Sequence, residues 1–189
     1  MRQFIYFSRK AHTSGNFKNL MEAGRLDIVC HVIIMSFFVS NNIRENVKLH
    51  LFFYGPPAAP KHLEIMANKS ISKKDVAGLI KRMLFKYKRG KKVEAFENCF
   101  IEKNSLIKVT EELAKTRNIY LLDKDGINIR NVEIKENPVF ILGDHEGFAK
   151  KELKRLSKSA IKVSLGKINY FSSQVMAILN NELDLRGID

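Results

Sequence analysis

The stretch that decides the fold is Pro138-Val139-Phe140-Ile141-Leu142, which runs directly into Gly143-Asp144-His145-Glu146-Gly147. An apolar run followed by a polar segment between two glycines predicts a buried strand that ends in a loop at the sheet edge. Glycine at both ends of the loop permits positive φ angles and a close approach to the main chain. The spacing differs from the G-x-G-x-x-G pattern that binds dinucleotides. On this stretch alone, a ligand loop and an ordinary turn are both open interpretations.

Strands and helices alternate on both sides of this stretch, which predicts an α/β layer architecture. The expected strands cover residues 2–8, 47–54, 62–66, 98–102, 119–123, 138–142 and 160–165. The expected helices cover residues 25–39, 72–90, 105–116 and 150–157, and a last helix begins near residue 172. Ser72-Lys73-Lys74-Asp75 matches a capping box, and Lys124-Asp125-Gly126 matches a turn that closes a strand. With no internal repeat and no convincing linker, we expect a single domain over residues 1–189.

The bulk composition favours a globular protein with a substantial core. The chain has 189 residues, 45% of them hydrophobic, which is enough to bury a core of ordinary size. No apolar run reaches membrane-spanning length and the N-terminus lacks a signal-peptide layout, so we expect no membrane partner and a cytoplasmic location. Cys30 and Cys99 lie far apart and outside any ligand motif, so we expect buried thiols, no disulfide and no metal.

The formal net charge is +13, an excess that favours a polyanionic partner. Between Lys61 and Lys92 the chain has many Lys and Arg residues but only Glu64 and Asp75 as acids. A concentrated basic patch is typical of a nucleic-acid binder, although the lysine-rich surface of a heat-adapted protein gives the same composition. We expect the helix that ends near Gly90 to hold phosphates through Arg82, Lys86 and Arg89.

Three expected strands end on similar short segments: Leu121-Leu122-Asp123, Leu142-Gly143-Asp144 and Ser164-Leu165-Gly166-Lys167-Ile168. Because ligands of open α/β sheets lie beyond the carboxyl ends of strands, the three segments predict one pocket. Leucine side chains and backbone amides suit an uncharged aromatic group such as adenine. No Walker loop is present, which argues against triphosphate hydrolysis. Taken singly, each segment is also compatible with an ordinary strand-to-loop transition.

Five segments, taken together and in this order, resemble a known enzyme family. They are Gly24-Arg25-Leu26-Asp27, Tyr54-Gly55-Pro56-Pro57, residues 118–122, residues 137–147 and Val163-Ser164-Leu165. The family is that of the archaeal tRNA pseudouridine N1-methyltransferases, which belong to the SPOUT class of S-adenosylmethionine-dependent RNA methyltransferases. The resemblance extends from Met1 to about Leu185. Its most specific part is the Gly-Asp-His-x-Gly loop together with the Gly-Arg-Leu-Asp segment.

The resemblance implies a SPOUT-type, mostly parallel sheet flanked by helices, with a C-terminal trefoil knot, and a homodimer. It also implies methylation of N1 of pseudouridine 54 in the tRNA T loop, with S-adenosyl-L-methionine as the cofactor. The implied cofactor contacts are Leu122, Gly143, Ser164, Leu165, Gly166, Lys167, Ile168 and Val175. Two departures fall in this set, because the family commonly has Ser-Pro at Gly166-Lys167 and often a cysteine at Val175.

Methyl transfer from a sulfonium is an in-line displacement, so the enzyme needs positioning and, for an N–H nucleophile, a proton acceptor. We expect Asp27 to accept or orient that proton and Arg25 to hold a phosphate or the carbonyl oxygens of the base. An acid in the first turn of a helix is equally explained by the helix dipole. His145 is a second candidate base, whereas Asp144 is expected to brace the loop through main-chain N–H groups.

Two other functions fit the same residues. One is the related N1-methyltransferase that acts on a pseudouridine in small-subunit rRNA, which shares the chemistry. The other is a non-catalytic RNA-binding SPOUT protein, which the departures at Gly166-Lys167 and Val175 would permit. The short chain and the Gly-Asp-His-x-Gly loop favour the tRNA enzyme.

Overall fold

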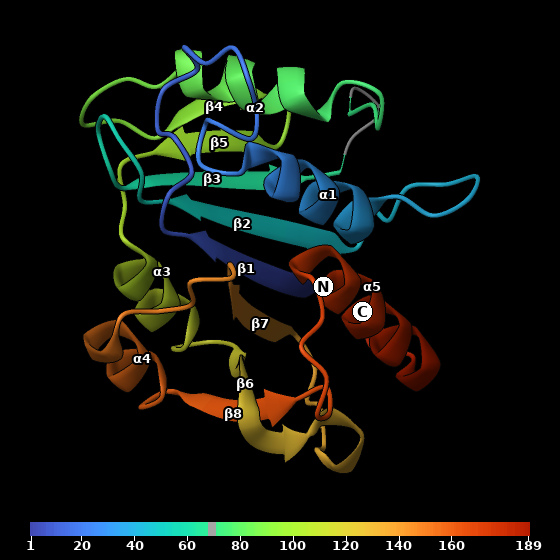
Figure 1. Cartoon of the computed structure of the whole chain (residues 1–189). Coiled ribbons are helices and arrows are strands. Elements are labelled where there is room, and N and C mark those ends of the chain that lie inside the picture. Colours follow the sequence, from blue (N-terminus) through green and yellow to red (C-terminus); the bar gives the residue numbers. More distant parts are fainter. Residues whose placement is uncertain (68–70) are drawn as a thin grey trace.

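The computed structural model describes residues 1–67 and 71–189 and shows one eight-stranded sheet with helices on both faces (Figure 1). The strands are β1 (Arg2–Ser8), β2 (Val47–Phe53), β3 (Lys61–Met66), β4 (Val93–Phe96), β5 (Cys99–Glu102), β6 (Asn118–Asn128), β7 (Pro138–Gly143) and β8 (Ala160–Ser164). The helices are α1 (Leu26–Phe37), α2 (Val76–Phe85), α3 (Leu106–Leu113), α4 (Lys150–Leu156) and α5 (Ser172–Arg186), with a 3-10 turn at Ile129–Asn131. The predicted α/β architecture is confirmed.

The sheet has two parts that differ in strand direction, and its strand order is β4-β5-β3-β2-β1-β7-β6-β8. In the parallel part, β2, β1, β7, β6 and β8 run in the same direction. In the antiparallel part, β3, β5 and β4 extend the sheet from the other edge of β2. The sheet is therefore mixed, and the prediction of a mostly parallel sheet describes the parallel part only.

Side chains of β1 alternate between two hydrophobic cores, as the two-residue period of a strand requires. Phe4 and Tyr6 pack with residues of α1, α2 and α5, whereas Ile5 and Phe7 pack with residues of α3 and α4. Figure 1 shows these two groups of helices on opposite faces of the sheet. Because both faces of the central strands are covered, a ligand can reach their main chain only at the strand ends. Within the described ranges, no helix combines the length and the apolar character needed to cross a membrane.

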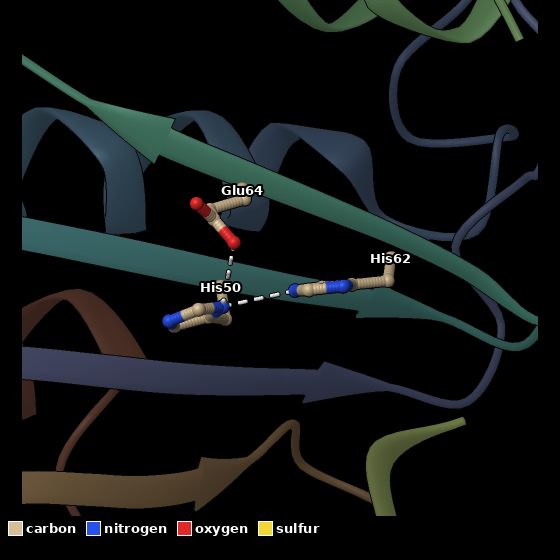
Figure 2. Close-up of side chains that lie close together, drawn as sticks. All are labelled: His50, His62 and Glu64. Carbon is tan, nitrogen blue, oxygen red and sulfur yellow. Dashed lines mark hydrogen bonds and ion pairs between the residues drawn. The ribbon is translucent and has the colours of Figure 1, made fainter. Parts of the chain in front are cut away.

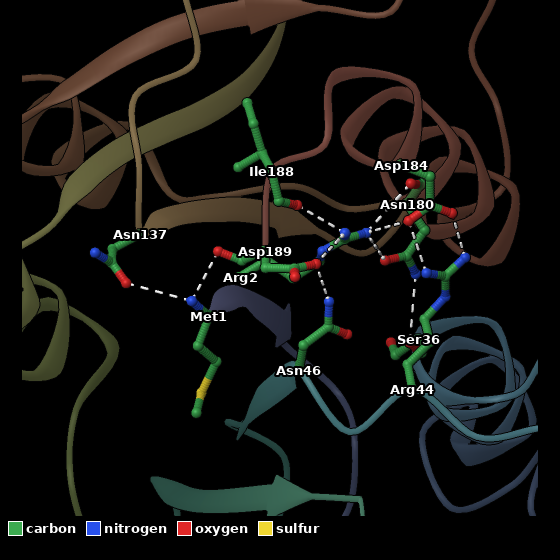
Figure 3. Close-up of polar contacts among 10 residues, drawn as sticks. All are labelled: Met1, Arg2, Ser36, Arg44, Asn46, Asn137, Asn180, Asp184, Ile188 and Asp189. Carbon is green, nitrogen blue, oxygen red and sulfur yellow. Dashed lines mark hydrogen bonds and ion pairs between the residues drawn. The ribbon is translucent and has the colours of Figure 1, made fainter.

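A buried arginine fixes the position of α5 (Figure 3). Arg2 is 1% exposed, and its guanidinium donates to Asp184 Oδ1 at 2.8 Å and to the carbonyl of Ile188 at 2.7 Å. The same group donates to the carbonyl of Asn180 at 3.3 Å. Arg44 also pairs with the Asp184 carboxylate. A guanidinium shared among several oxygens of α5 and the chain end sets the orientation of that helix.

The structure corrects the predicted start of the basic helix. α2 begins at Val76, and its N-cap, Asp75, makes no side-chain cap hydrogen bond. The prediction of a capping box that begins at Ser72 is therefore wrong. The Asp75 carboxylate instead pairs with Arg82 at 2.8 Å, so a salt bridge along the helix has replaced the expected cap.

Two strand predictions are also incomplete. The turn at residues 124–126 does not end its strand, because Leu122 and Ile127 both pair with Val163 and β6 returns to β8 after looping out. The strands predicted from the sequence do not include β4. It has only four residues, Val93–Phe96, which is too short for an alternating pattern to be recognised.

Candidate active site

A cavity of about 730 Å³ opens where β7 and β8 end and α5 begins, beside the point at which β6 loops out. This volume lies within the range of small-molecule sites. Its walls come from segments that are distant in the sequence: residue 28, residues 122–124, 142–148, 163–166, 168–172 and residue 175. The three segments predicted to end strands therefore meet in one pocket, as the sequence predicts. Seven of the eight residues expected to contact a cofactor line it; the eighth, the exposed Lys167, does not.

The loop after β7 keeps its shape through main-chain hydrogen bonds. The Asp144 carboxylate accepts a bond from the backbone N–H of Arg9 at 2.9 Å and another from that of Glu146 at 2.9 Å. Its expected bracing role is confirmed. Gly147 has a φ of +62°, and a Cβ on Gly143 would lie 3.2 Å from the Gly147 Cα. The narrow loop therefore favours glycine at both ends.

The turn after β8 is closed by one serine. Ser164 Oγ accepts a bond from the backbone N–H of Gly166 at 3.1 Å and donates to its carbonyl at 3.2 Å. Ser172 Oγ donates to the carbonyl of Gly143 at 3.5 Å, which links the start of α5 to the glycine loop. Phe171 also lines the cavity and is 76% exposed. The outer wall of the cavity is therefore apolar and open to solvent.

The cavity combines apolar walls with carboxylates. A hydrogen bond from Lys162 lowers the pKa of Asp123, and one from Lys10 lowers the pKa of Glu146, so both acids are ionised at neutral pH. S-adenosylmethionine has an adenine that suits apolar walls and a positive sulfonium that suits neighbouring carboxylates. This lining therefore fits the cofactor implied by the sequence resemblance. The apolar surface is supplied by Leu122, Leu142, Leu165 and Val175.

Arg25 and Asp27 form a bidentate ion pair next to Ile28, which lines the cavity. Arg25 Nε donates to Asp27 Oδ1 and Arg25 Nη2 to Asp27 Oδ2, both at 3.0 Å. The hydrogen bond from Arg25 lowers the pKa of Asp27. Asp27 is therefore a weak proton acceptor as long as Arg25 holds it.

The backbone before α1 adopts a left-handed conformation at two consecutive residues. Gly24 has a φ of +71° and Arg25 a φ of +64°. A Cβ at Gly24 would lie 1.8 Å from the carbonyl oxygen of Lys10, so only glycine fits. For arginine this conformation costs about 1–2 kcal/mol, and such strain is concentrated at functional sites. The Gly-Arg-Leu-Asp segment thus sets a backbone turn as well as an ion pair.

Tyr6 belongs to this site, although the sequence did not single it out. Its side chain is 1% exposed, and burial, followed by the charge of Asp144, raises its pKa. Ser172 and the charge of Arg25 act on that pKa in the opposite direction, and the charge of Asp27 raises it further. Tyr6 therefore connects the ion pair to the start of α5. The available signal was a single hydroxyl within the apolar run of β1.

The residues assigned to RNA lie on and just after α2, on the antiparallel part of the sheet. Arg82 and Lys86 both lie over the ring of Phe96 in β4, 5.6 Å and 4.9 Å from its centroid. Arg89 is exposed in the turn that follows the helix. The structure thus places these three cations on α2 and the turn after it, near β4, at the edge of the sheet opposite to β8 (Figure 1).

One group of three side chains could offer ligands to a metal ion among the residues that the structure describes: His50, His62 and Glu64 (Figure 2). Their possible ligand atoms lie within 4.8 Å of one another. The two rings are only 16° from parallel with centroids 5.1 Å apart, and His50 Nδ1 lies 2.9 Å from His62 Nε2. The two nitrogens therefore point head-on, as in an N–H···N hydrogen bond. An ion bound to both at about 2.0–2.1 Å requires converging lone pairs. His62 Nδ1 also lies 3.0 Å from Glu102 Oε1, so this cluster forms a buried hydrogen-bonded chain.

Solved structures with similar folds include RNA methyltransferases. The crystal structure of Archaeoglobus fulgidus Nep1 bound to S-adenosylhomocysteine matches with a TM-score of 0.64 and 15% identity, over 98% of each chain. Ribosomal RNA small subunit methyltransferase E from Neisseria gonorrhoeae, bound to S-adenosyl methionine, matches with a TM-score of 0.52 and 7% identity, over 98% of this chain and 66% of that one. The chain is therefore a mixed α/β protein, with an eight-stranded sheet flanked by helices, whose fold is similar to that of Nep1.

The chain belongs to the family described as "Putative SAM-dependent RNA methyltransferase", which matches residues 1–188. It is 32% identical to the tRNA (pseudouridine(54)-N(1))-methyltransferase of Pyrococcus abyssi, over 100% of both chains. It is 30% identical to the enzyme of the same name from Methanocaldococcus jannaschii, over 100% of this chain and 98% of the relative. The resemblance to the archaeal tRNA pseudouridine N1-methyltransferases is confirmed.

Proposed function

We propose that this protein transfers a methyl group from S-adenosylmethionine to N1 of pseudouridine 54 in the T loop of tRNA. The observation that carries the proposal is the end-to-end match to relatives with that activity in their names, at 32% identity over 100% of the chain. The cavity in the parallel part and the basic surface in the antiparallel part provide separate places for the cofactor and the RNA.

The cofactor would bind in the cavity at the strand ends, where it supplies an electrophilic methyl group on a sulfonium sulfur. Apolar side chains there pack against its adenine, and Asp123 and Glu146 offset its positive charge. The family departures at Gly166 and Val175 are compatible with this arrangement, because one contact is main-chain and the other apolar. The residues in this role are Leu122, Gly143, Ser164, Leu165, Gly166, Ile168 and Val175, whereas Lys167 is left out because it does not line the cavity.

Asp27 and Arg25 would handle the N1 proton. In the protein alone, Arg25 occupies both oxygens of Asp27. A phosphate of the RNA backbone offers the guanidinium a competing bidentate partner. When Arg25 turns to that phosphate, the pKa of Asp27 rises and its carboxylate can accept the proton. RNA binding would thus activate the base.

Arg82, Lys86 and Arg89 would hold the RNA backbone. Contacts to phosphates orient a substrate without reading its sequence. The target base lies within a folded loop, so it must be opened or flipped before its N1 can approach the methyl group. The ion pair and the basic helix therefore act on the same RNA at different points.

The proposal also includes a cytoplasmic homodimer with a C-terminal trefoil knot, and a single domain over residues 1–189. A continuous eight-stranded sheet supports one domain, and membership of the family supports the knot. Exposed apolar side chains of Ile168, Phe171 and Leu185 support a dimer. The reaction requires no metal, because the sulfonium transfers its methyl group with release of a neutral thioether, which is already a good leaving group.

The test combines calorimetry with methyl transfer to two RNAs, a tRNA T arm and a small-subunit rRNA fragment, each containing one pseudouridine. Transfer to the T arm alone supports the proposal. Transfer to the rRNA fragment alone identifies the related rRNA enzyme. Cofactor binding without transfer to either RNA identifies a non-catalytic RNA-binding protein, and absence of S-adenosylmethionine binding contradicts the cofactor site.

A further inference from the structure

An exposed aromatic ring lies among the cations of α2. Phe85 is the last residue of the helix and is 61% exposed. Arg82 lies three residues before it, near the same side of the helix, and Lys86 follows it directly; both cations are exposed. A single exposed apolar side chain is common on protein surfaces. This ring differs from such a side chain because a loop packs against one side of it and ordered cations lie in the same segment.

The loop before α1 holds one side of the Phe85 ring. A Cβ on Gly15 would lie 2.7 Å from Phe85 Cδ2 and 2.8 Å from Phe85 Cε2, so the backbone of that loop packs directly against the ring. Lys81 Nζ donates to the carbonyl of Phe17 at 3.3 Å, which ties the same loop to α2. The ring is therefore fixed on one side, and most of its surface still faces solvent.

The cations beside Phe85 are held in place as well. The ring of Phe96 lies below both Arg82 and Lys86, 5.6 Å and 4.9 Å from the charged groups. Arg82 has a further partner in Asp75, at 2.8 Å. Cations whose stems are ordered before binding lose less conformational entropy when they meet a phosphate.

We propose that Phe85 stacks on an unpaired nucleobase of the bound RNA while Arg82 and Lys86 hold the adjacent phosphates. Proteins recognise single-stranded or splayed-out nucleotides by stacking them on aromatic side chains inside a positively charged groove. A protein partner would bury the ring against apolar groups, whereas the exposed side chains of this segment include the cations Arg82, Lys86 and Arg89. The inference rests on the proposed function only in taking RNA as the partner.

The chain has no tryptophan, so Phe85→Trp introduces a single fluorescent reporter at the site. Stacking on a base is expected to quench its fluorescence when a pseudouridine-containing T arm is added. Ile161→Trp is the control, because Ile161 is 45% exposed on β8, at the opposite edge of the sheet. Its fluorescence should stay unchanged.

A second measurement separates stacking from charge. Phe85→Ala is expected to weaken T-arm binding by roughly 5- to 150-fold, with an unchanged dependence of affinity on salt. Arg82→Gln and Lys86→Gln should instead each reduce the salt slope by about one. Phe85→Leu keeps an apolar side chain against Gly15 but has no ring to stack. It should fold as the wild type does and lose T-arm affinity as Phe85→Ala does, which shows that the loss does not come from unfolding.

Binding of the T arm without quenching of Phe85→Trp, or with equal quenching of Ile161→Trp, would overturn the inference. An unchanged affinity of Phe85→Ala would do the same. If the wild type binds the T arm and Phe85→Trp is quenched, but no methyl group is transferred, stacking stands and the proposed activity fails. If the wild type does not bind RNA at all, both fail.

Discussion

The parallel and antiparallel parts of the sheet would bind their partners by different physical means. In the parallel part, the cavity is shaped by strand ends, glycine backbone and apolar side chains. In the antiparallel part, the surface consists of long cationic side chains laid over aromatic rings. A cavity of this kind depends on backbone shape and close packing, whereas the basic surface depends on charge and is screened by salt. Substitutions in the two parts should therefore have distinct effects.

The largest expected effect comes from the ion pair beside the cavity. Asp27→Asn removes the proposed proton acceptor, so turnover on pseudouridine-containing tRNA should fall by roughly 10²- to 10⁴-fold. Binding of S-adenosylmethionine, measured by calorimetry, should not change. Glu22→Gln, in the loop before α1, is the control and should leave turnover unaltered. Unchanged turnover of Asp27→Asn would remove Asp27 from the mechanism.

The backbone turn that presents this ion pair should be the most sensitive to a small change. Gly24→Ala forces a Cβ against the carbonyl of Lys10, so the free energy of unfolding should fall by about 3 kcal/mol. Gly90→Ala is the matched control: its φ is +75°, close to the +71° of Gly24, but an added Cβ would meet nothing within 4 Å. Its expected loss is about 1 kcal/mol. Equal losses in urea denaturation would show that close packing at Gly24 is unimportant.

The antiparallel part should respond to salt instead. Charge reversal by Arg82→Glu and Lys86→Glu should weaken tRNA binding and flatten its dependence on salt, because fewer counterions are released. Cofactor affinity should be the same as in the wild type. Lys115→Glu, just after α3, is the control, since Lys115 already pairs with Glu112 and α3 covers the other face of the sheet. A salt slope equal to that of the wild type would count against this surface.

The smallest expected effect is on pH dependence at the junction of the two parts. Burial lowers the pKa of His50 well below its usual value, while in the unfolded chain it is about 6.5. Below that pH the unfolded chain takes up a proton that the folded chain does not, so stability falls as the pH is lowered. His50→Gln should flatten the decline between pH 6.5 and 5 measured by urea denaturation, whereas the exposed His31→Gln should not. The same decline in both variants would contradict this assignment.

The sequence predicted the cavity because its signals are local. The run from Pro138 to Leu142 and the segments at Leu122 and Ser164 each read as strand ends, and parallel strands bring their carboxyl ends to one edge. Family resemblance then indicated the ligand. The resemblance implies the whole turn from Ser164 to Ile168 as cofactor contacts, and Lys167 is the one residue of that turn that does not line the cavity.

The remaining features depend on contacts between distant residues. Pairing of Arg25 with Asp27 requires a left-handed backbone, which is set by the packing of Gly24 against Lys10. The N-cap residue Asp75 makes no side-chain cap hydrogen bond and pairs with Arg82 instead, which the capping pattern at Ser72 does not predict. Such long-range packing cannot be read from spacing along one chain.

The most direct measurement compares two tRNAs that differ only in having pseudouridine or uridine at position 54. Mass spectrometry of the nucleosides should detect a methyl group on N1 of the pseudouridine after incubation with the protein and S-adenosylmethionine. The uridine tRNA has no N1–H in that position and should stay unmodified. Equal methylation of both tRNAs, or of neither while a pseudouridine-containing rRNA is methylated, would contradict the proposed function.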